Sequence, residues 1–444
     1  MGTLAGRIFD YSRKVMGRKL GGSLSDEVRK RIVDSIFVSY GARGAEPVKI
    51  ARKALLPSSG KYNSTVYFSK EKASVEVSAF INGCMTRYLD YNDTYLTKKE
   101  FAHPSDNVPA MLCLAQAEGL GCADAIRATY LAYQVQCSLS DAASLRNRGW
   151  DHVVYLGISS AAGAAGLLGL DRERFENAIN LGVSNSISMR QVRAGELSMW
   201  KGCTAANAAR NGLQAALLAR EGMTGPSPIF EGEMGFFRQV TGRFVPRFGP
   251  DRIKKTLIKD HPVEYNAMSS VDAALRLRGR VKGEIKRISV DVSSVMHRTI
   301  VKDPERLRPK TRETADHSMP YIIAYTLTYG EPTPSSYSER YIRDRSILRL
   351  IDRMDLRVVE KYDHMYPDFV PVRIAISATG GDFVEQVLVP KGHYRDPYSW
   401  DDLRRKGRKL VPEESWVDDM VSAGRSLERR SAADVFELLA SAPG

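Results

Sequence analysis

The chain has 444 residues, of which 43% are hydrophobic and 26% charged, and it carries a formal net charge of +13. This length and composition are typical of a globular protein with a large core and two or three domains. The excess of positive charge favours an acidic partner, which can be a nucleic acid, an anionic membrane surface or a polycarboxylate substrate.

The first half of the chain shows the spacing of amphipathic helices. In the run 25–40, Ser25 is a candidate N-cap and apolar residues from Val28 to Tyr40 recur on one face. The other runs of this kind are 75–89, 108–118, 123–139, 153–170, 171–188 and 205–221. Run 153–170 carries no charge, but its many glycines and alanines favour a buried helix over a membrane span. Helices with short connections predict an all-helical domain.

The pattern changes after the irregular, Gly- and Pro-rich segment that starts near Gly225. Residues 285–295 and 370–378 alternate apolar and polar side chains, and Gly380-Gly381 predicts a hairpin to the strand 383–389. Helical spacing returns at 316–327, at 341–354 and from 401 onward. We therefore predict a mainly α protein: a discontinuous helical domain (residues 1–255 and 393–444) and an α+β second domain (residues 256–392).

The segment 89–107 gathers Asp90, Asp93, Thr94 and His103 in one predicted loop. A histidine titrates near neutrality and a nearby aspartate can fix its tautomer, so this pattern is typical of acid–base chemistry. The same residue types also cap helices, and spacing alone does not separate the two interpretations.

Three further clusters are candidates for a functional site. Lys201 precedes the run 205–219, where the positive end of a helix favours anions, although an ordinary surface lysine is the alternative. Lys259 and Glu264 lie in a polar segment that can equally be an inter-domain turn. His317 and Tyr321 follow Asp316 in a segment that can equally be a capped helix start.

Several classes of chemistry lack their sequence patterns. The chain contains no P-loop, dinucleotide fingerprint, G-x-S-x-G elbow or H-E-x-x-H zinc helix, so phosphoryl transfer, hydride transfer and metalloprotease chemistry lack support. Its five cysteines form no C-x-x-C pair, which disfavours an iron–sulfur cluster and favours buried thiols in a reducing compartment. The basic runs 276–287 and 404–409 have no interleaved aromatic residues, so no nucleic-acid partner is expected.

Four blocks in order resemble the MmgE/PrpD family, and within it the 2-methylcitrate dehydratases. They are L-D-Y-N-D-T-Y-L…H-P-S-D-N at 89–107, S-M-W-K-G…A-N-A-A-R-N at 198–211, G-M-T-G-P at 222–226 and T-R-E-T-A-D-H-S-M-P-Y at 311–321. The resemblance implies a usually homodimeric enzyme of propionate metabolism with a helical domain, an α+β lid and a site between them. It also implies removal of water from a tricarboxylate without a cofactor. A cytoplasmic protein is expected because run 153–170 is interpreted as a buried helix.

The resemblance carries site roles onto particular residues. It implies that His103, Asp90, Lys201 and Lys259 are catalytic, and that Thr94 and Tyr321 line the substrate. We add Glu264 and His317 from the same segments as substrate-binding candidates. The site is expected to need no cofactor and no metal, and no membrane partner is expected.

Two departures separate the chain from the related cis-aconitate decarboxylases. Glu264 stands where those enzymes carry histidine, and the spacer between Thr94 and His103 is longer here. Both departures favour the dehydratase branch. A decarboxylase or a dicarboxylate epimerase of the same family is the alternative, and a basic nucleic-acid-binding protein with a vestigial site is the alternative from a different class.

Overall fold

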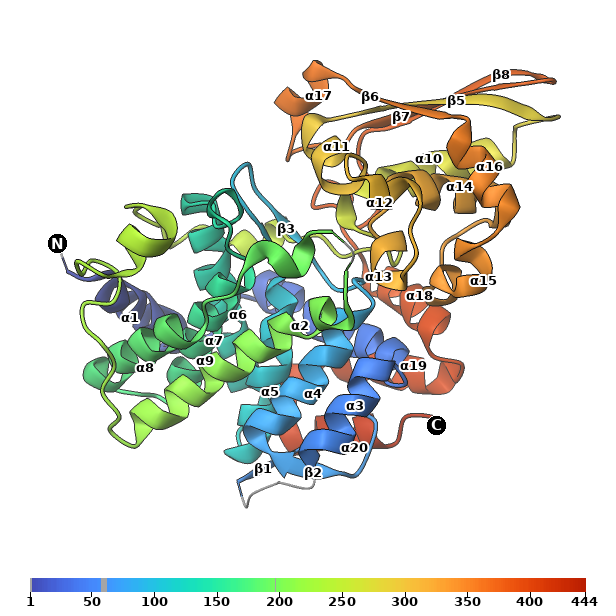
Figure 1. Cartoon of the computed structure of the whole chain (residues 1–444). Coiled ribbons are helices and arrows are strands. Elements are labelled where there is room, and N and C mark those ends of the chain that lie inside the picture. The colour runs from blue at the N-terminus through green and yellow to red at the C-terminus, as the bar shows by residue number, and fades with distance from the viewer. Residues whose placement is uncertain (1, 57–61, 196) are drawn as a thin grey trace. The chain divides into compact units, whose positions relative to one another are not determined.

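The computed structural model describes residues 2–56, 62–195 and 197–444, which divide into two compact units (Figure 1). The helical unit comprises Met1–Val192, Gly202–Ile258 and Tyr398–Gly444, and the sheet unit comprises Arg193–Lys201 and Lys259–Pro397, within the described residues. The predicted fold class is confirmed: the chain is mostly helical, with a small mixed sheet toward its C-terminal part. The predicted domain boundaries after residues 255 and 392 stay a prediction.

The helical unit consists mainly of long helices. They are α1 (Leu4–Met16), α2 (Gly22–Ala42), α3 (Glu46–Leu55), α4 (Val75–Tyr88), α5 (Val108–Ala117), α6 (Cys122–Ala142), α7 (Val153–Leu167), α8 (Arg172–Asn185), α9 (Thr204–Arg220), α18 (Trp400–Leu410), α19 (Glu414–Arg425) and α20 (Ala432–Ala440). Two short hairpins join them, β1 (Asn63–Thr65) with β2 (Lys72–Ser74) and β3 (Tyr95–Leu96) with β4 (Phe101–Ala102). Most of the predicted helical runs are found, whereas α1 and α3 were not predicted.

Helix α7 is the buried centre of this unit, as its small residues predict. All of its residues are buried, and it packs against α6, α8 and α9. A Cβ atom added at Gly212 of α9 would lie 2.4 Å from the backbone oxygen of Gly157 in α7, so only glycine permits this approach. No helix among the described residues is long and apolar enough to cross a membrane.

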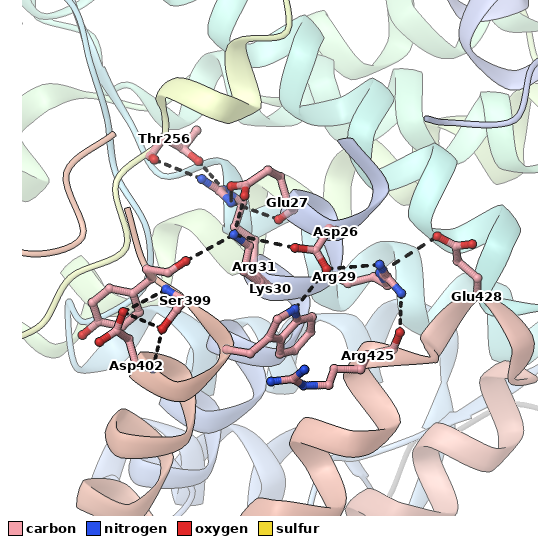
Figure 2. A network of polar contacts seen from close by, with 12 residues as sticks. Asp26, Glu27, Arg29, Lys30, Arg31, Thr256, Ser399, Asp402, Arg425 and Glu428 are labelled. Carbon is pink, nitrogen blue, oxygen red and sulfur yellow. Dashed lines mark hydrogen bonds and ion pairs between the residues drawn. The ribbon is translucent and has the colours of Figure 1, made fainter. Parts of the chain in front are cut away.

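Polar side chains of helix α2 bind the C-terminal segment that begins at Tyr398, and they also bind Thr256 (Figure 2). Lys30 Nζ donates to the Tyr398 carbonyl at 3.2 Å, and Arg31 donates to the Thr256 carbonyl at 3.0 Å. The indole nitrogen of Trp400 donates to Asp26 at 3.0 Å. Ser25 does not cap the helix as predicted, because α2 begins earlier, at Gly22, and the Ser25 hydroxyl donates to Glu428 instead.

A buried ion pair joins α18 to α2. Lys406 Nζ donates to Asp34 Oδ1 at 2.7 Å and to the backbone oxygen of Tyr91 at 2.8 Å, and both charged side chains are almost fully buried. Burial raises the pKa of Asp34 to about 6, although Lys406 acts to lower it. Helix α18 therefore holds both α2 and the start of the loop 89–107.

The sheet unit has a four-stranded sheet covered by helices. Its strands are β5 (Ile285–Val292), β6 (Met354–Val358), β7 (Val372–Ala378) and β8 (Gly381–Val387), and its helices are α10 (Met268–Arg278), α11 (Ser294–Ile300), α12 (Pro304–Leu307), α13 (Arg312–Ala315), α14 (Met319–Tyr329), α15 (Glu339–Ile342), α16 (Arg345–Asp352) and α17 (Glu360–Met365).

The strand order is β6-β5-β7-β8, with β5 parallel to β6 and the other pairs antiparallel. The predicted hairpin between β7 and β8 is confirmed, and Gly381 adopts the positive φ of +119° that its turn requires. The alternating residues Ile288, Val290, Ile374 and Ile376 face the core, where α10 packs against β7 and β8. Strand β6 was not predicted, because its five residues follow a helical run without a turn signal.

Replacing Lys406 with methionine tests the buried ion pair. The change leaves Asp34 buried without its counter-charge, and we expect it to lower the free energy of unfolding by ~3–5 kcal/mol. Urea unfolding followed by circular dichroism measures this change. The exposed neighbour Lys409 gives the matched control, since Lys409→Met should change stability by less than ~0.5 kcal/mol. Equal effects of the two substitutions would contradict the role of Lys406.

His393 makes the stability of the sheet unit depend on pH. Burial lowers the pKa of His393 from 6.5 to about 4, so the unfolded chain binds this proton before the folded chain does. The contribution of His393 to the free energy of unfolding is therefore complete above about pH 6.5. It falls by ~1.4 kcal/mol per pH unit as the pH falls toward 4. Urea unfolding between about pH 7 and 5 should show a flatter pH dependence for His393→Gln than for the wild type. Identical slopes would rule out this contribution.

Candidate functional site

The loop 89–107 in the helical unit is held rigidly by its backbone. The backbone N–H of Thr94 donates to the Leu257 carbonyl at 2.9 Å, and that of Leu257 donates to the Thr94 carbonyl at 2.7 Å. Asp93 Oδ1 accepts a hydrogen bond from the Ser105 backbone N–H at 3.0 Å, and burial raises the pKa of Asp93. The loop then leads through the turn Pro104–Asn107 into α5. Side chains on this loop therefore have little freedom to move.

His103 has a defined orientation in this loop. Its Nδ1 lies 2.7 Å from the backbone oxygen of Asp93, which can only accept, so Nδ1 carries a hydrogen. Its Nε2 lies 3.0 Å from an NH₂ group of Arg87, which can only donate. Thr94 Oγ1 lies 3.3 Å from Nδ1. The contacts therefore assign a neutral ring with its lone pair on Nε2.

Arg87 is the residue of this group that sequence reasoning missed. It is buried in the last turn of α4, and its NH1 donates to Asp90 Oδ1 at 2.7 Å while its NH2 contacts His103. Asp90 has a φ of +49°, an unusual backbone conformation for a residue other than glycine. The i−3 spacing of Arg87 from Asp90 at a helix end was the available signal. Arg87 thus links two predicted catalytic residues, Asp90 and His103.

A second Asp–His pair lies beside His103 and was also missed. Asp151 and His152 are buried at the start of α7, and His152 Nδ1 lies 2.9 Å from Asp151 Oδ1. The imidazole rings of His103 and His152 are 5.4 Å apart, edge to face. The sequence signal was the adjacent Asp-His dipeptide, which stands 48 positions after His103 in the chain. Two histidines and several carboxylates therefore meet in the helical unit.

The sheet unit holds a second group around Asp316. Lys201 Nζ lies 3.7 Å from Asp316 Oδ1, and Arg312 lies 3.7 Å from Asp316 Oδ2. His317 Nδ1 binds Asp316 Oδ1 directly. Burial alone would raise the pKa of Asp316, but Lys201, His317 and Arg312 hold it below its usual value. Lys201 is 1% exposed, so it is not an ordinary surface lysine.

This group has the chemistry of an oriented histidine beside a buried cation. Asp316 accepts from His317 Nδ1, so Nδ1 carries a hydrogen and the contact fixes the orientation of the ring. The alternative interpretation of this segment, a capped helix start, is also correct in part. Ser318 caps α14 by accepting from the Tyr321 N–H at 3.1 Å. One short segment therefore caps a helix and presents His317.

The remaining predicted residues of the sheet unit are buried and most have clear partners. Lys259 is fully buried. Glu264 accepts from the backbone N–H and side-chain amide of Asn266 at 2.8 and 3.0 Å, which caps a short turn. The Tyr321 hydroxyl donates to the Ser336 carbonyl at 2.6 Å. The predicted site residues therefore fall into two groups: Asp90, Thr94 and His103 in the helical unit, and Lys201, Lys259, Glu264, His317 and Tyr321 in the sheet unit.

Comparison with known proteins identifies similar chains. Residues 7–248 match the MmgE/PrpD N-terminal domain, and residues 261–417 match the MmgE/PrpD C-terminal domain. The 2-methylcitrate dehydratase of Cupriavidus necator is 29% identical over 72% of this chain and 71% of that protein. That of Escherichia coli K12 is 28% identical over the same shares. The human cis-aconitate decarboxylase is 25% identical over 98% of this chain and 94% of that protein.

The tautomer of His103 can be measured directly. In protein labelled with ¹⁵N-histidine, the ring of His103 should show a protonated Nδ1 and an unprotonated Nε2 at about pH 8, because the Asp93 carbonyl and the Arg87 guanidinium impose this form. The His103→Asn variant assigns the resonance by its disappearance. The opposite tautomer would show that these two contacts do not orient the ring.

Proposed function

Because the chain belongs to the MmgE/PrpD family, we propose that it is a hydro-lyase that removes water from 2-methylcitrate or citrate. The products are 2-methyl-cis-aconitate or cis-aconitate, and the reaction needs no cofactor. The names of the relatives from Cupriavidus necator and Escherichia coli support this substrate class. The observation that carries the proposal is the buried, oriented imidazole of His103. We place the enzyme in propionate metabolism and expect it to act as a homodimer.

The chemistry of this dehydration requires cationic groups. A proton leaves the carbon beside a carboxylate, and hydroxide leaves the neighbouring carbon. Loss of the proton adds negative charge to a substrate that is already anionic. A donor placed where this charge develops typically lowers the barrier by ~3–4 kcal/mol. We assign this role to Lys201 and Lys259, both buried, and the net charge of +13 attracts the trianion.

Proton transfer requires a histidine with an accessible lone pair or proton. We assign His103 to this step, in which Nε2 exchanges its contact with Arg87 for the substrate. It then takes the proton or, after protonation, returns it to the departing hydroxyl. Asp90 positions His103 through Arg87 or acts as the base itself. The oriented His317 supports its assignment to substrate binding.

Thr94, Tyr321 and Glu264 complete the proposed substrate-binding set. Thr94 Oγ1 can donate to a carboxylate beside His103. The Tyr321 hydroxyl now donates to Ser336, so binding a carboxylate would require it to exchange that partner. Glu264 repels a carboxylate and can accept from a substrate hydroxyl, which suits a hydroxy acid better than an unsaturated one.

Product analysis separates this proposal from its rivals within the family. A dehydratase incubated with 2-methylcitrate or citrate produces a conjugated alkene that absorbs in the ultraviolet. An epimerase produces no alkene, and a decarboxylase releases CO₂ from cis-aconitate. CO₂ release from cis-aconitate without any alkene from either hydroxy acid would overturn the proposal in favour of the activity named for the human relative.

Replacing His103 with alanine tests its role in proton transfer. We expect kcat to fall by ~100-fold or more, because general acid–base catalysis typically contributes that much. The control is His364→Ala, which removes an exposed histidine of α17 and should leave kcat within about twofold. Circular dichroism and urea unfolding establish that both variants are folded. Unchanged turnover in a folded His103→Ala variant would remove the assignment.

A further inference from the structure

A histidine and three carboxylates meet in the sheet unit, away from Asp316. His261 is buried, with a side chain only 3% exposed, and its Nε2 lies 3.1 Å from Asp272 Oδ1 of α10. Its Nδ1 lies 2.9 Å from Glu331 Oε1, just beyond the end of α14. One ligand atom each from Asp260, His261 and Glu331 lies within 4.8 Å of the others.

The two ring nitrogens of His261 have different surroundings. The contact between Nε2 and Asp272 has the geometry of a hydrogen bond, so Asp272 orients the ring. The contact between Nδ1 and Glu331 is short but does not meet that geometry, and Nδ1 is buried without a hydrogen bond. A buried ring nitrogen that faces a carboxylate with poor hydrogen-bond geometry is a second indication, besides the acidic cluster, of a missing ligand.

We propose that Asp260, His261 and Glu331 bind a divalent transition-metal ion of the Zn²⁺ or Mn²⁺ class. One imidazole nitrogen and two carboxylate oxygens are ligands that such ions accept. Metal-binding histidines usually donate their other ring N–H to a carboxylate, and Asp272 occupies that position. An ion with ligands at ~2.1 Å separates them by about 3.3 Å, close to the contact between Nδ1 and Glu331.

A hydrogen bond holds the backbone next to His261, and the carboxylates of the cluster reach the solvent. The Tyr337 hydroxyl donates to the Pro262 carbonyl at 2.7 Å, next to His261. Asp260 and Glu331 are partly exposed, so an ion can reach the site from solvent. The ion would join the segment 259–264 to the end of α14.

Without a metal, a proton can balance the same carboxylates. Burial alone would lower the pKa of His261, but Asp272 and Glu331 raise it to about 9. A metal must displace this proton before it binds Nδ1. The competing description is thus a buried ion-pair cluster of His261 with Asp272 and Glu331, and the experiment must separate the two.

Direct metal binding by the full-length chain is the test. Protein treated with EDTA is titrated with Zn²⁺ at about pH 8 by calorimetry, and bound zinc is counted by mass spectrometry. We expect about one ion per chain with Kd near 10 µM or tighter, and a higher melting temperature with zinc. Cobalt(II) should give visible bands without thiolate charge transfer, because the ligands are nitrogen and oxygen.

Variants locate the ion. His261→Asn and Glu331→Gln should each weaken zinc binding by at least about tenfold, and Asp272→Asn should weaken it by 10–100-fold through the orientation of His261. The matched control is His364→Asn, which removes an exposed histidine that stands beside Asp363 on α17. It should leave zinc binding unchanged. Urea unfolding shows which variants are folded.

Three results would overturn the proposal. One is no binding of Zn²⁺, Mn²⁺ or Co²⁺ by the wild type below ~1 mM, which leaves the protonated ion cluster as the description. Another is undiminished zinc binding in folded His261→Asn and Glu331→Gln. The third is a thiolate signal with cobalt(II), which would place the ion on cysteine. None of these measurements depends on enzymatic activity, so their outcome is independent of the proposed dehydration.

Discussion

The ammonium group of Lys406 is the constraint on which the helical unit depends. It is fully buried and has to be satisfied, and it binds the carboxylate of Asp34 in α2 and the carbonyl of Tyr91 at the start of the loop 89–107. A helix near the C-terminus therefore holds a helix near the N-terminus and the loop that carries Asp90, Thr94 and His103. A buried charge permits little movement, because any displacement would leave it unpaired.

Both groups of site residues follow the same physical logic. In the helical unit, the Arg87 guanidinium is paired with Asp90 and contacts the lone-pair side of His103. In the sheet unit, the Lys201 ammonium and His317 share the carboxylate of Asp316. In each group a buried charge is paired with a nearby opposite charge, and hydrogen bonds orient an imidazole beside the pair. Such preorganised groups suit a reaction in which negative charge grows on an anionic substrate.

The sequence predicted much of the fold but less of the site. The alternation of Ile374 and Ile376 and the glycines after them identified the β7–β8 hairpin, because both signals are local. Ser25 was misread as a cap because its hydroxyl binds Glu428, which is 403 positions away. Local signals existed for Arg87 and for the pair Asp151–His152, but their contacts with His103 form only in the folded chain.

The sequence by itself determined the fold class, the position of the hairpin and the order of family blocks, because hydrophobic period and turn residues act over a few positions. Only the tertiary structure decided the charge environment of each candidate side chain. It showed that Lys201 is buried beside Asp316, that His103 faces Arg87, and that Tyr321 already has an acceptor. Protonation and hydrogen bonding depend on atoms within a few ångströms, and the chain brings those atoms together from distant positions.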